Sequence, residues 1–215
     1  MLRIQKFTFN PFQENTYVIV NGSTAILIDP GMSNKIEEEE LISFLKAHNL
    51  ILEAVWLTHA HIDHIMGIGF IQTHFDVPFY MHSLEHENLK SGPLVAKAYG
   101  IPFNDFEAFS PFLLDDMERI SINDQTFEII FAPGHSAGSM CFYHKDTGQL
   151  IGGDVLFRQS IGRTDLPGGD FETLQQSIQQ KVYLLPDDTT VYSGHGPETT
   201  IGYEKVNNAF IKALN

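Results

Sequence analysis

The chain has 215 residues, enough for one sizeable hydrophobic core and short for two independent domains. It carries 27 acidic and 13 basic side chains, which gives a formal net charge of −14. That excess of negative charge argues against phosphate-rich partners. We therefore expect neither nucleic acid nor an anionic membrane as a partner, and the sequence indicates no oligomeric state.

The first residues lack the basic head and apolar stretch of a signal peptide, and no apolar run reaches the length of a membrane span. The single cysteine, Cys141, cannot form an internal disulfide. These features predict a cytoplasmic protein. Cys141 lies in an apolar, strand-like run, so we interpret it as a small buried hydrophobic residue rather than a nucleophile.

Strands and helices are expected to alternate along the first half of the chain. Its strands are predicted at 2–9, 16–20, 24–29, 53–57 and 77–81, and its helices at 34–48, near His64 and at 83–99. Asn21-Gly22 is expected to form the turn of a hairpin.

The second half is expected to hold β-meanders and two further helices. Its strands are predicted near 118–122, 126–131, 139–144, 149–152 and 189–192, and its helices at 171–184 and from about 202. Asp170 is a suitable N-cap for the first of these helices. Helices interleaved with meanders predict an α+β fold in which two sheets pack together with helices outside.

Four of the predicted strands end in a residue that can bind a metal ion. These residues are His59, His135, Asp154 and His195. The last three each follow a glycine, which lets the backbone turn sharply and approach a site closely. Ligands at the ends of neighbouring strands can converge on one edge of a sheet.

The stretch Thr-His-Ala-His-Ile-Asp-His at 58–64 adds three more candidates. His59 and His61 are two apart in extended backbone, so they point the same way and can bind one cation. Asp63 and His64 fall where the chain turns into a helix, and they can face a second cation.

His135 would complete the first site and His195 the second, while the two oxygens of Asp154 can bridge both ions. Two metals about 3.5–4 Å apart would then share a water. Imidazole and carboxylate ligands suit zinc, and also iron or manganese.

A rival metal motif lies at 82–86, where His-Ser-Leu-Glu-His matches the inverted zinc-protease pattern H-x-x-E-H on a predicted helix. A solvated helical face explains these five letters more simply, and we prefer that interpretation.

The sequence resembles the metallo-β-lactamase superfamily. The motifs that support the resemblance are Asp29-Pro30-Gly31, the 58–64 block, and the segments 134–139, 152–154 and 194–196. It implies an αββα four-layer sandwich of two mixed β-sheets flanked by helices, as one domain over 1–215. The implied ligands of one metal are His59, His61 and His135. Those of the other are Asp63, His64 and His195, with Asp154 bridging and Asp29 supporting the loop.

Within the superfamily, residues 154–170 and 194–202 look most like glyoxalase II-type hydrolases, which cleave thioesters such as S-lactoylglutathione. Arg163 occupies the place of a basic residue in that family, while Asp165 and Pro197 stand where it has tyrosines. A short C-terminal helix is expected in place of the family's longer helical region. The acyl group and the thiol carrier therefore stay open.

The expected mechanism is attack by a metal-activated hydroxide on a thioester carbonyl, because a metal lowers the pKa of its bound water to about 7. Asp63 would protonate the leaving thiolate. Arg163 would pair either with a substrate carboxylate or, as a structural ion pair, with Asp165 or Asp170.

Three other functions are compatible with these motifs. A persulfide dioxygenase would hold a single iron at positions matching His59, His135 and Asp154. A phosphodiester or RNA hydrolase would use the same metals, but the scarcity of lysine and arginine counts against it. A non-catalytic module would keep its metals in closed coordination.

Overall fold

The computed structural model of the protein describes residues 2–103 and 106–214. The chain divides into two compact units, Met1–Asp115 with Ile122–Gln125 and Asp116–Ser121 with Thr126–Asn215. Each unit is built around one mixed sheet. None of the helices in the described ranges is long and apolar enough to cross a bilayer.

The sheet of the first unit has the strand order β1-β2-β3-β4-β5-β6. Its strands are β1 (Arg3–Phe9), β2 (Glu14–Asn21), β3 (Thr24–Ile28), β4 (Ile51–Trp56), β5 (Phe79–Met81) and β6 (Phe112–Leu113). The pairs β1–β2 and β2–β3 are antiparallel, and from β3 to β6 the neighbours run parallel. Parallel neighbours end at the same edge, so the residues that follow β3 and β4 come close together.

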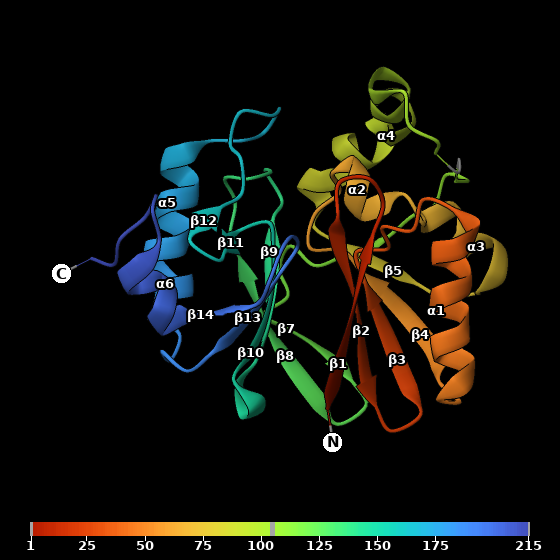
Figure 1. Cartoon of the computed structure of the whole chain (residues 1–215), viewed down its shortest axis with the longest axis horizontal. Helices are drawn as coiled ribbons and strands as arrows, with labels where there is room; N and C mark the ends of the chain where they lie inside the picture. The colour runs from red at the N-terminus through yellow and green to blue at the C-terminus, as the bar shows by residue number, and fades with distance from the viewer. Residues whose placement is uncertain (1, 104–105, 215) are drawn as a thin grey trace. The chain divides into compact units, whose positions relative to one another are not determined.

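Helices cover this sheet and hold the segments that follow its strands. They are α1 (Lys35–Ala47), α2 (Ile62–Ile65), α3 (Ile68–His74), the 3-10 turn η1 (Ser83–Glu85) and α4 (His86–Tyr99). Asn34 caps α1 by accepting hydrogen bonds from the backbone N–H groups of Ile36 and Glu37. Leu41 and Leu45 turn inward from α1, which runs beside β3 and β4 (Figure 1), and pack in one apolar core with the sheet.

The sheet of the second unit has the strand order β14-β13-β10-β9-β8-β7. Its strands are β7 (Arg119–Ile122), β8 (Gln125–Phe131), β9 (Met140–His144), β10 (Gln149–Gly153), β13 (Thr190–Ser193) and β14 (Thr199–Thr200). The pair β10–β13 is parallel, and the pairs β8–β9, β9–β10 and β13–β14 are antiparallel. The carboxyl ends of β10 and β13 therefore lie at one edge.

The remaining elements of the second unit lie outside its six-stranded sheet. They are the 3-10 turns η2 (Lys145–Thr147) and η3 (Val182–Leu184), the hairpin β11 (Leu156–Phe157) and β12 (Ser160–Ile161), and the helices α5 (Phe171–Gln180) and α6 (Ile201–Asn207), which lie together beside this sheet (Figure 1). Leu174 and Ile178 of α5 and Ile201 of α6 enter the apolar core of this unit. Asp170 caps α5, as predicted, by accepting a hydrogen bond from the Thr173 N–H.

Most of the predicted elements are present, and the departures are local. Asn21 pairs with Thr24, so the hairpin turn consists of Gly22 and Ser23 rather than Asn21-Gly22. The helix predicted over 171–184 ends at Gln180 and is followed by η3. The sequence patterns did not predict α3, β6, β11, β12 or β14.

Candidate metal centre

The first unit contributes four predicted ligands, which we call the first ligand set: His59, His61, Asp63 and His64. Strand β4 ends at Trp56, the chain bends at Thr58, and His61, in an extended conformation, is the N-cap of α2. Asp63 and His64 lie inside α2. The predicted turn into a helix at Asp63 and His64 is therefore confirmed.

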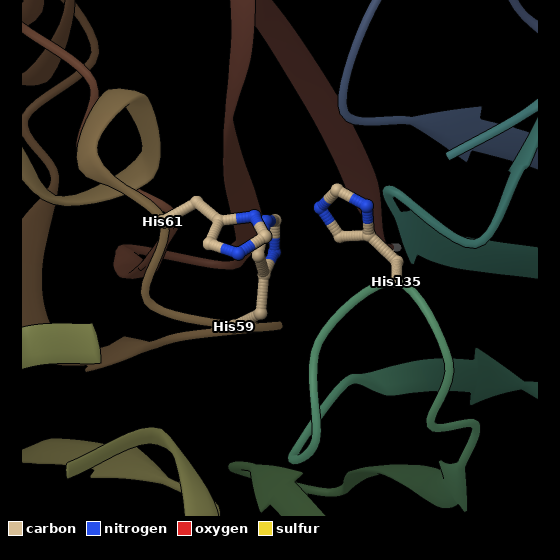
Figure 2. Close-up of side chains that lie close together, drawn as sticks. All are labelled: His59, His61 and His135. Carbon is tan, nitrogen blue, oxygen red and sulfur yellow. The ribbon is translucent and has the colours of Figure 1, made fainter. Parts of the chain in front are cut away.

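The side chains of the first ligand set lie close together. The ring centroids of His59 and His61 are 4.8 Å apart, with the ring planes at 86° (Figure 2). His59 and His64 are closer, at 4.1 Å between centroids. His64 Nε2 lies 3.8 Å from Asp63 Oδ2. His59 and His64 are buried, whereas His61 and Asp63 are partly exposed.

Asp29, at the end of β3, holds this arrangement with both oxygens of its carboxylate. Its Oδ1 accepts the backbone N–H of Thr58 at 2.7 Å, and its Oδ2 accepts the Thr58 hydroxyl at 2.5 Å. Asp29 Oδ2 also lies 3.0 Å from His64 Nδ1. The expected supporting role of Asp29 therefore has a structural basis, because a carboxylate at Nδ1 orients an imidazole whose Nε2 is the ligand atom.

Glu14 is a carboxyl group in this region that the sequence did not single out. It is fully buried in β2, and its Oε2 accepts a hydrogen bond from Thr16 Oγ1 at 2.8 Å. Its Oε1 lies 3.7 Å from His64 Nδ1. Burial raises the pKa of Glu14 well above its ordinary value, although His64 opposes the shift.

The second unit contributes the other three ligands, the second ligand set: His135, Asp154 and His195. Each follows a strand end, of β8, β10 and β13 respectively, as predicted. Figure 2 shows the His135 imidazole projecting from the loop that follows β8. The Gly194 N–H donates to the Gly153 carbonyl at 2.7 Å, which ties the ends of β10 and β13 together.

Asp154 is the centre of the second ligand set. Its Oδ2 lies 3.5 Å from His135 Nε2 and 3.5 Å from His195 Nε2. Two ligand atoms that each lie about 2.0–2.1 Å from a tetrahedral zinc ion are about 3.4 Å apart. The observed spacing therefore suits atoms that bind a common ion. One oxygen of Asp154 faces both imidazoles, whereas its two oxygens were predicted to bridge the ions.

The other nitrogen of His135 is tied to the main chain. His135 Nδ1 lies 2.7 Å from the carbonyl oxygen of Arg163. A carbonyl only accepts, so Nδ1 carries the proton and Nε2 keeps the lone pair that a metal needs. This tether was not predicted, because a main-chain acceptor leaves no trace in residue type.

Two glycines allow the close approach of these segments. A Cβ at Gly162 would lie 1.9 Å from the Asp154 carbonyl oxygen and 2.9 Å from His135 Nδ1. Gly134 has φ +127, and a Cβ there would lie 2.2 Å from the Leu174 nitrogen of α5. No other residue type fits either position without moving a predicted ligand or α5.

The side chain of Arg163 forms a structural ion pair, one of the two alternatives considered for it. Its Nε and an η nitrogen donate to the two oxygens of Asp165 at 2.7 and 2.8 Å. The pair is exposed, and the hydrogen bonds from Arg163 lower the pKa of Asp165 to about 2. Asp170, the other partner considered, caps α5 instead.

The rival motif at 82–86 does not form the metal site that its letters suggest. His82 accepts the Leu84 N–H as the cap of η1, and the exposed His86 bonds to the Ser83 carbonyl through Nδ1. The interpretation of the motif as a solvated face is nevertheless wrong for Glu85, which is fully buried. That carboxylate accepts the backbone N–H of Ala60, between two predicted ligands.

The seven predicted ligands comprise five histidines and two aspartates, a set that suits zinc, iron or manganese. Within each unit the predicted ligands lie close together, and His64 and His135 are each oriented by a group at Nδ1.

The chain matches the family model described as the metallo-beta-lactamase superfamily over residues 9–195. Among curated proteins, it is 34% identical over 214 residues to "Probable metallo-hydrolase YqgX" of Bacillus subtilis, with 100% of both chains covered. It is 35% identical over 216 residues to "Hydroxyacylglutathione hydrolase GloC" of Haemophilus influenzae, with 99% of both covered.

Solved structures agree with this assignment. "BLEG-1 B3 metallo-beta-lactamase" is 38% identical, with a TM-score of 0.87 and coverage of 97% of this chain and 99% of that one. "TTHA1623 in a di-iron-bound form" is 35% identical, with a TM-score of 0.86 and coverage of 96% and 100%. The predicted fold class, two mixed sheets flanked by helices, is thereby confirmed. The chain belongs to the metallo-β-lactamase superfamily and is, at that level, a metal-dependent hydrolase.

Proposed function

We propose that the protein is a thioester hydrolase of the hydroxyacylglutathione hydrolase type, and that its two ligand sets together bind two divalent metal ions. The observation that carries the metal assignment is the tethering of His64 Nδ1 to Asp29 and of His135 Nδ1 to the Arg163 carbonyl. Both tethers present Nε2 as the ligand atom. The thioester assignment is supported by full-length similarity to the relative named as a hydroxyacylglutathione hydrolase.

Zinc, iron and manganese all suit the donor set, and the relative whose structure is titled as di-iron-bound supports iron. Such ions, when bound, supply Lewis acidity and a water whose pKa is about 7. We assign His59, His61 and His135 to one ion, Asp63, His64 and His195 to the other, and Asp154 to both.

The side chains of the protein orient the reactants and move one proton. Asp154 Oδ2, equidistant from His135 Nε2 and His195 Nε2, is the oxygen that we assign to the ions these two imidazoles would bind. Asp63, the partly exposed carboxylate of α2, would take the proton that the attacking water gives up and pass it to the leaving thiolate. The exposed Arg163 guanidinium offers a partner to a substrate carboxylate, although it must exchange Asp165 for it.

Hydrolysis of β-lactams is a second candidate, and it is favoured by the 38% identity to a structure titled as a B3 metallo-beta-lactamase. A β-lactam, like a thioester, is an acyl compound attacked at its carbonyl carbon, so the same ligand sets serve both reactions. The reactions differ in the leaving group, which stays attached after a β-lactam opens and departs as a thiolate from a thioester.

One preparation of the parent protein tests these assignments. Metals per chain are measured first. The same sample is then assayed with S-lactoylglutathione, a simple acyl thioester, a chromogenic cephalosporin, a phosphodiester, and glutathione persulfide with oxygen uptake as the readout. Two metals and thioester turnover support the proposal. One iron with oxygen uptake identifies a persulfide dioxygenase, and turnover of the cephalosporin or phosphodiester alone assigns that activity instead.

Asp154→Ala tests the bridging assignment. We expect metal content to fall and turnover to drop. Loss of a group that hydrogen-bonds to a metal ligand typically costs roughly 10–100-fold, and loss of a bridging ligand should cost more. Asp187→Ala is the matched control, because it removes an exposed aspartate of the same unit that pairs with Lys205. Full activity of Asp154→Ala with two bound metals would contradict the scheme.

A further inference from the structure

We infer that Glu85 is a positioning residue of the metal centre: its carboxylate holds the peptide between His59 and His61 and so sets how the two imidazoles present themselves to a metal ion. The inference rests on the proposed function, since it presumes that these histidines bind a metal. Glu85 itself is not one of the seven predicted ligands.

Glu85 ends η1, next to the first residue of α4, and its side chain is fully buried. Its Oε2 accepts two hydrogen bonds, from the Ala60 backbone N–H at 2.8 Å and from Asn88 Nδ2 at 2.9 Å. A buried carboxylate is costly unless such donors surround it. Asn88, one turn further along, therefore orients the oxygen that holds Ala60.

Ala60 is the residue between the two histidines, and it is itself buried. The segment that follows β4 has left the sheet there, so no strand neighbour supplies an acceptor for the Ala60 N–H. A buried backbone N–H needs one. Glu85 provides it, and the hydrogen bond restrains the peptide group between His59 and Ala60, next to His61.

The element that carries Glu85 also supports α2. A Cβ at Gly92 of α4 would lie 3.0 Å from Ile65 Cδ1 and 3.9 Å from Ile62 Cδ1, so α4 meets α2 almost at its backbone. Glu85 and Gly92 therefore brace both parts of the first ligand set, the extended segment with its two histidines and the short helix with Asp63 and His64.

Three substitutions of Glu85 distinguish the effect of losing its hydrogen bond to Ala60 from the effect of losing its negative charge. Glu85→Ala removes the acceptor, Glu85→Asp withdraws it by one methylene, and Glu85→Gln keeps an acceptor oxygen but removes the charge. The readouts are the affinity for Co²⁺ by chelator competition, the visible absorption spectrum of the Co²⁺ protein, and the melting temperature of the metal-free protein.

Glu204→Ala is the matched control in the second unit. Glu204 is also a fully buried carboxylate, and it accepts the Gln159 backbone N–H at 2.9 Å and Asn208 Nδ2 at 2.9 Å. Its loss removes the same kinds of hydrogen bond far along the chain from the histidine segment. We expect it to lower the melting temperature with little change in the Co²⁺ spectrum.

We expect Glu85→Ala and Glu85→Asp to weaken Co²⁺ affinity about 10–100-fold and to alter the spectrum, with Glu85→Gln close to the parent. If Glu85→Ala does not fold, the comparison of Asp with Gln decides. Parent-like affinity in folded Glu85→Ala and Glu85→Asp would overturn the inference, and so would a Gln variant as weak as the Asp variant. A parent protein that binds no Co²⁺ would instead refute the proposed function.

Discussion

Asp29 Oδ2 lies 3.0 Å from His64 Nδ1, and both side chains are buried. Asp29 reaches this position with a backbone φ of +50, a conformation that most residue types avoid. The same carboxylate also accepts the Thr58 N–H and hydroxyl. The carboxylate of Asp29, which follows β3, thus fixes the position of Thr58 and the orientation of the His64 ring through hydrogen bonds.

Asp29→Asn tests the role of these hydrogen bonds without changing the shape of the side chain. Asparagine tolerates positive φ, so the backbone strain stays the same. The amide, however, turns an N–H₂ group toward one of the donors that the carboxylate satisfied. We expect metal affinity to fall about 10–100-fold, measured by chelator competition. Unchanged affinity would mean that Asp29 is only a turn residue.

Gly162→Ala should disrupt the second ligand set, because the new Cβ would overlap the Asp154 carbonyl oxygen. We expect a loss of bound metal together with a lower melting temperature, measured on the same sample. Gly22→Ala is the control, since nothing lies within 4 Å of that Cβ and only its φ of +66 is strained. It should cost about 1 kcal/mol of stability and no metal. Equal metal content in the two variants would contradict this account of Gly162.

Arg163→Ala tests the proposed contact with a substrate carboxylate. Its exposed ion pair with Asp165 contributes little to stability, so the variant should fold. We expect KM for an anionic thioester to rise about tenfold, with kcat nearly unchanged, because one ionic contact is lost. A neutral thioester should show no change. Equal effects on both substrates would rule out recognition of a carboxylate by Arg163.

Cys141 should make the stability of the protein fall at alkaline pH. It is fully buried in β9, and burial raises the pKa of its thiol to about 12. The unfolded chain, with a pKa of about 8.5, loses the proton first, so the stabilisation is complete below that pH and is lost as pH rises toward 12. By pH 10.5 the loss should be about 3 kcal/mol.

Denaturant titrations at pH 8 and pH 10.5 measure this loss, with Cys141→Ala as the reference. The reference lacks the thiol, so the parent should lose more stability than the variant does between the two pH values. The native parent should also resist alkylation at pH 8. An equal pH response in both proteins would exclude the thiol as the cause.

The strands that carry ligands could be predicted because their sequences are short apolar runs that stop at glycine or at a polar residue. His135, Asp154 and His195 each follow such a run, and the structure places them at the strand ends. The two-residue strands β11, β12 and β14 could not be predicted, since two residues show no periodicity. Helix α3 was missed for another reason. Its N-cap is Gly67, which has no side chain that could cap the helix, so the sequence carries no signal for its first residue.

The groups that hydrogen-bond to the predicted ligands or to their backbone could mostly not be predicted from the sequence. Glu85 bonds to Ala60, 25 residues away, and Asn10 Nδ2 donates to the carbonyl of Asp63, 53 residues away. No local pattern encodes such contacts, which arise only when the sheet assembles. Glu85 was misjudged for this reason, because the H-x-x-E-H letters draw attention to the helix rather than to what the helix faces.

The tether of His135 has a consequence for how the protein can change. The acceptor is the main-chain carbonyl of residue 163, and every amino acid has that group. The side chain at 163 can therefore be exchanged, in a laboratory library or by natural drift, while the imidazole keeps its orientation. The proposed substrate contact of the residue 163 side chain and the orientation of His135 can therefore change independently of each other.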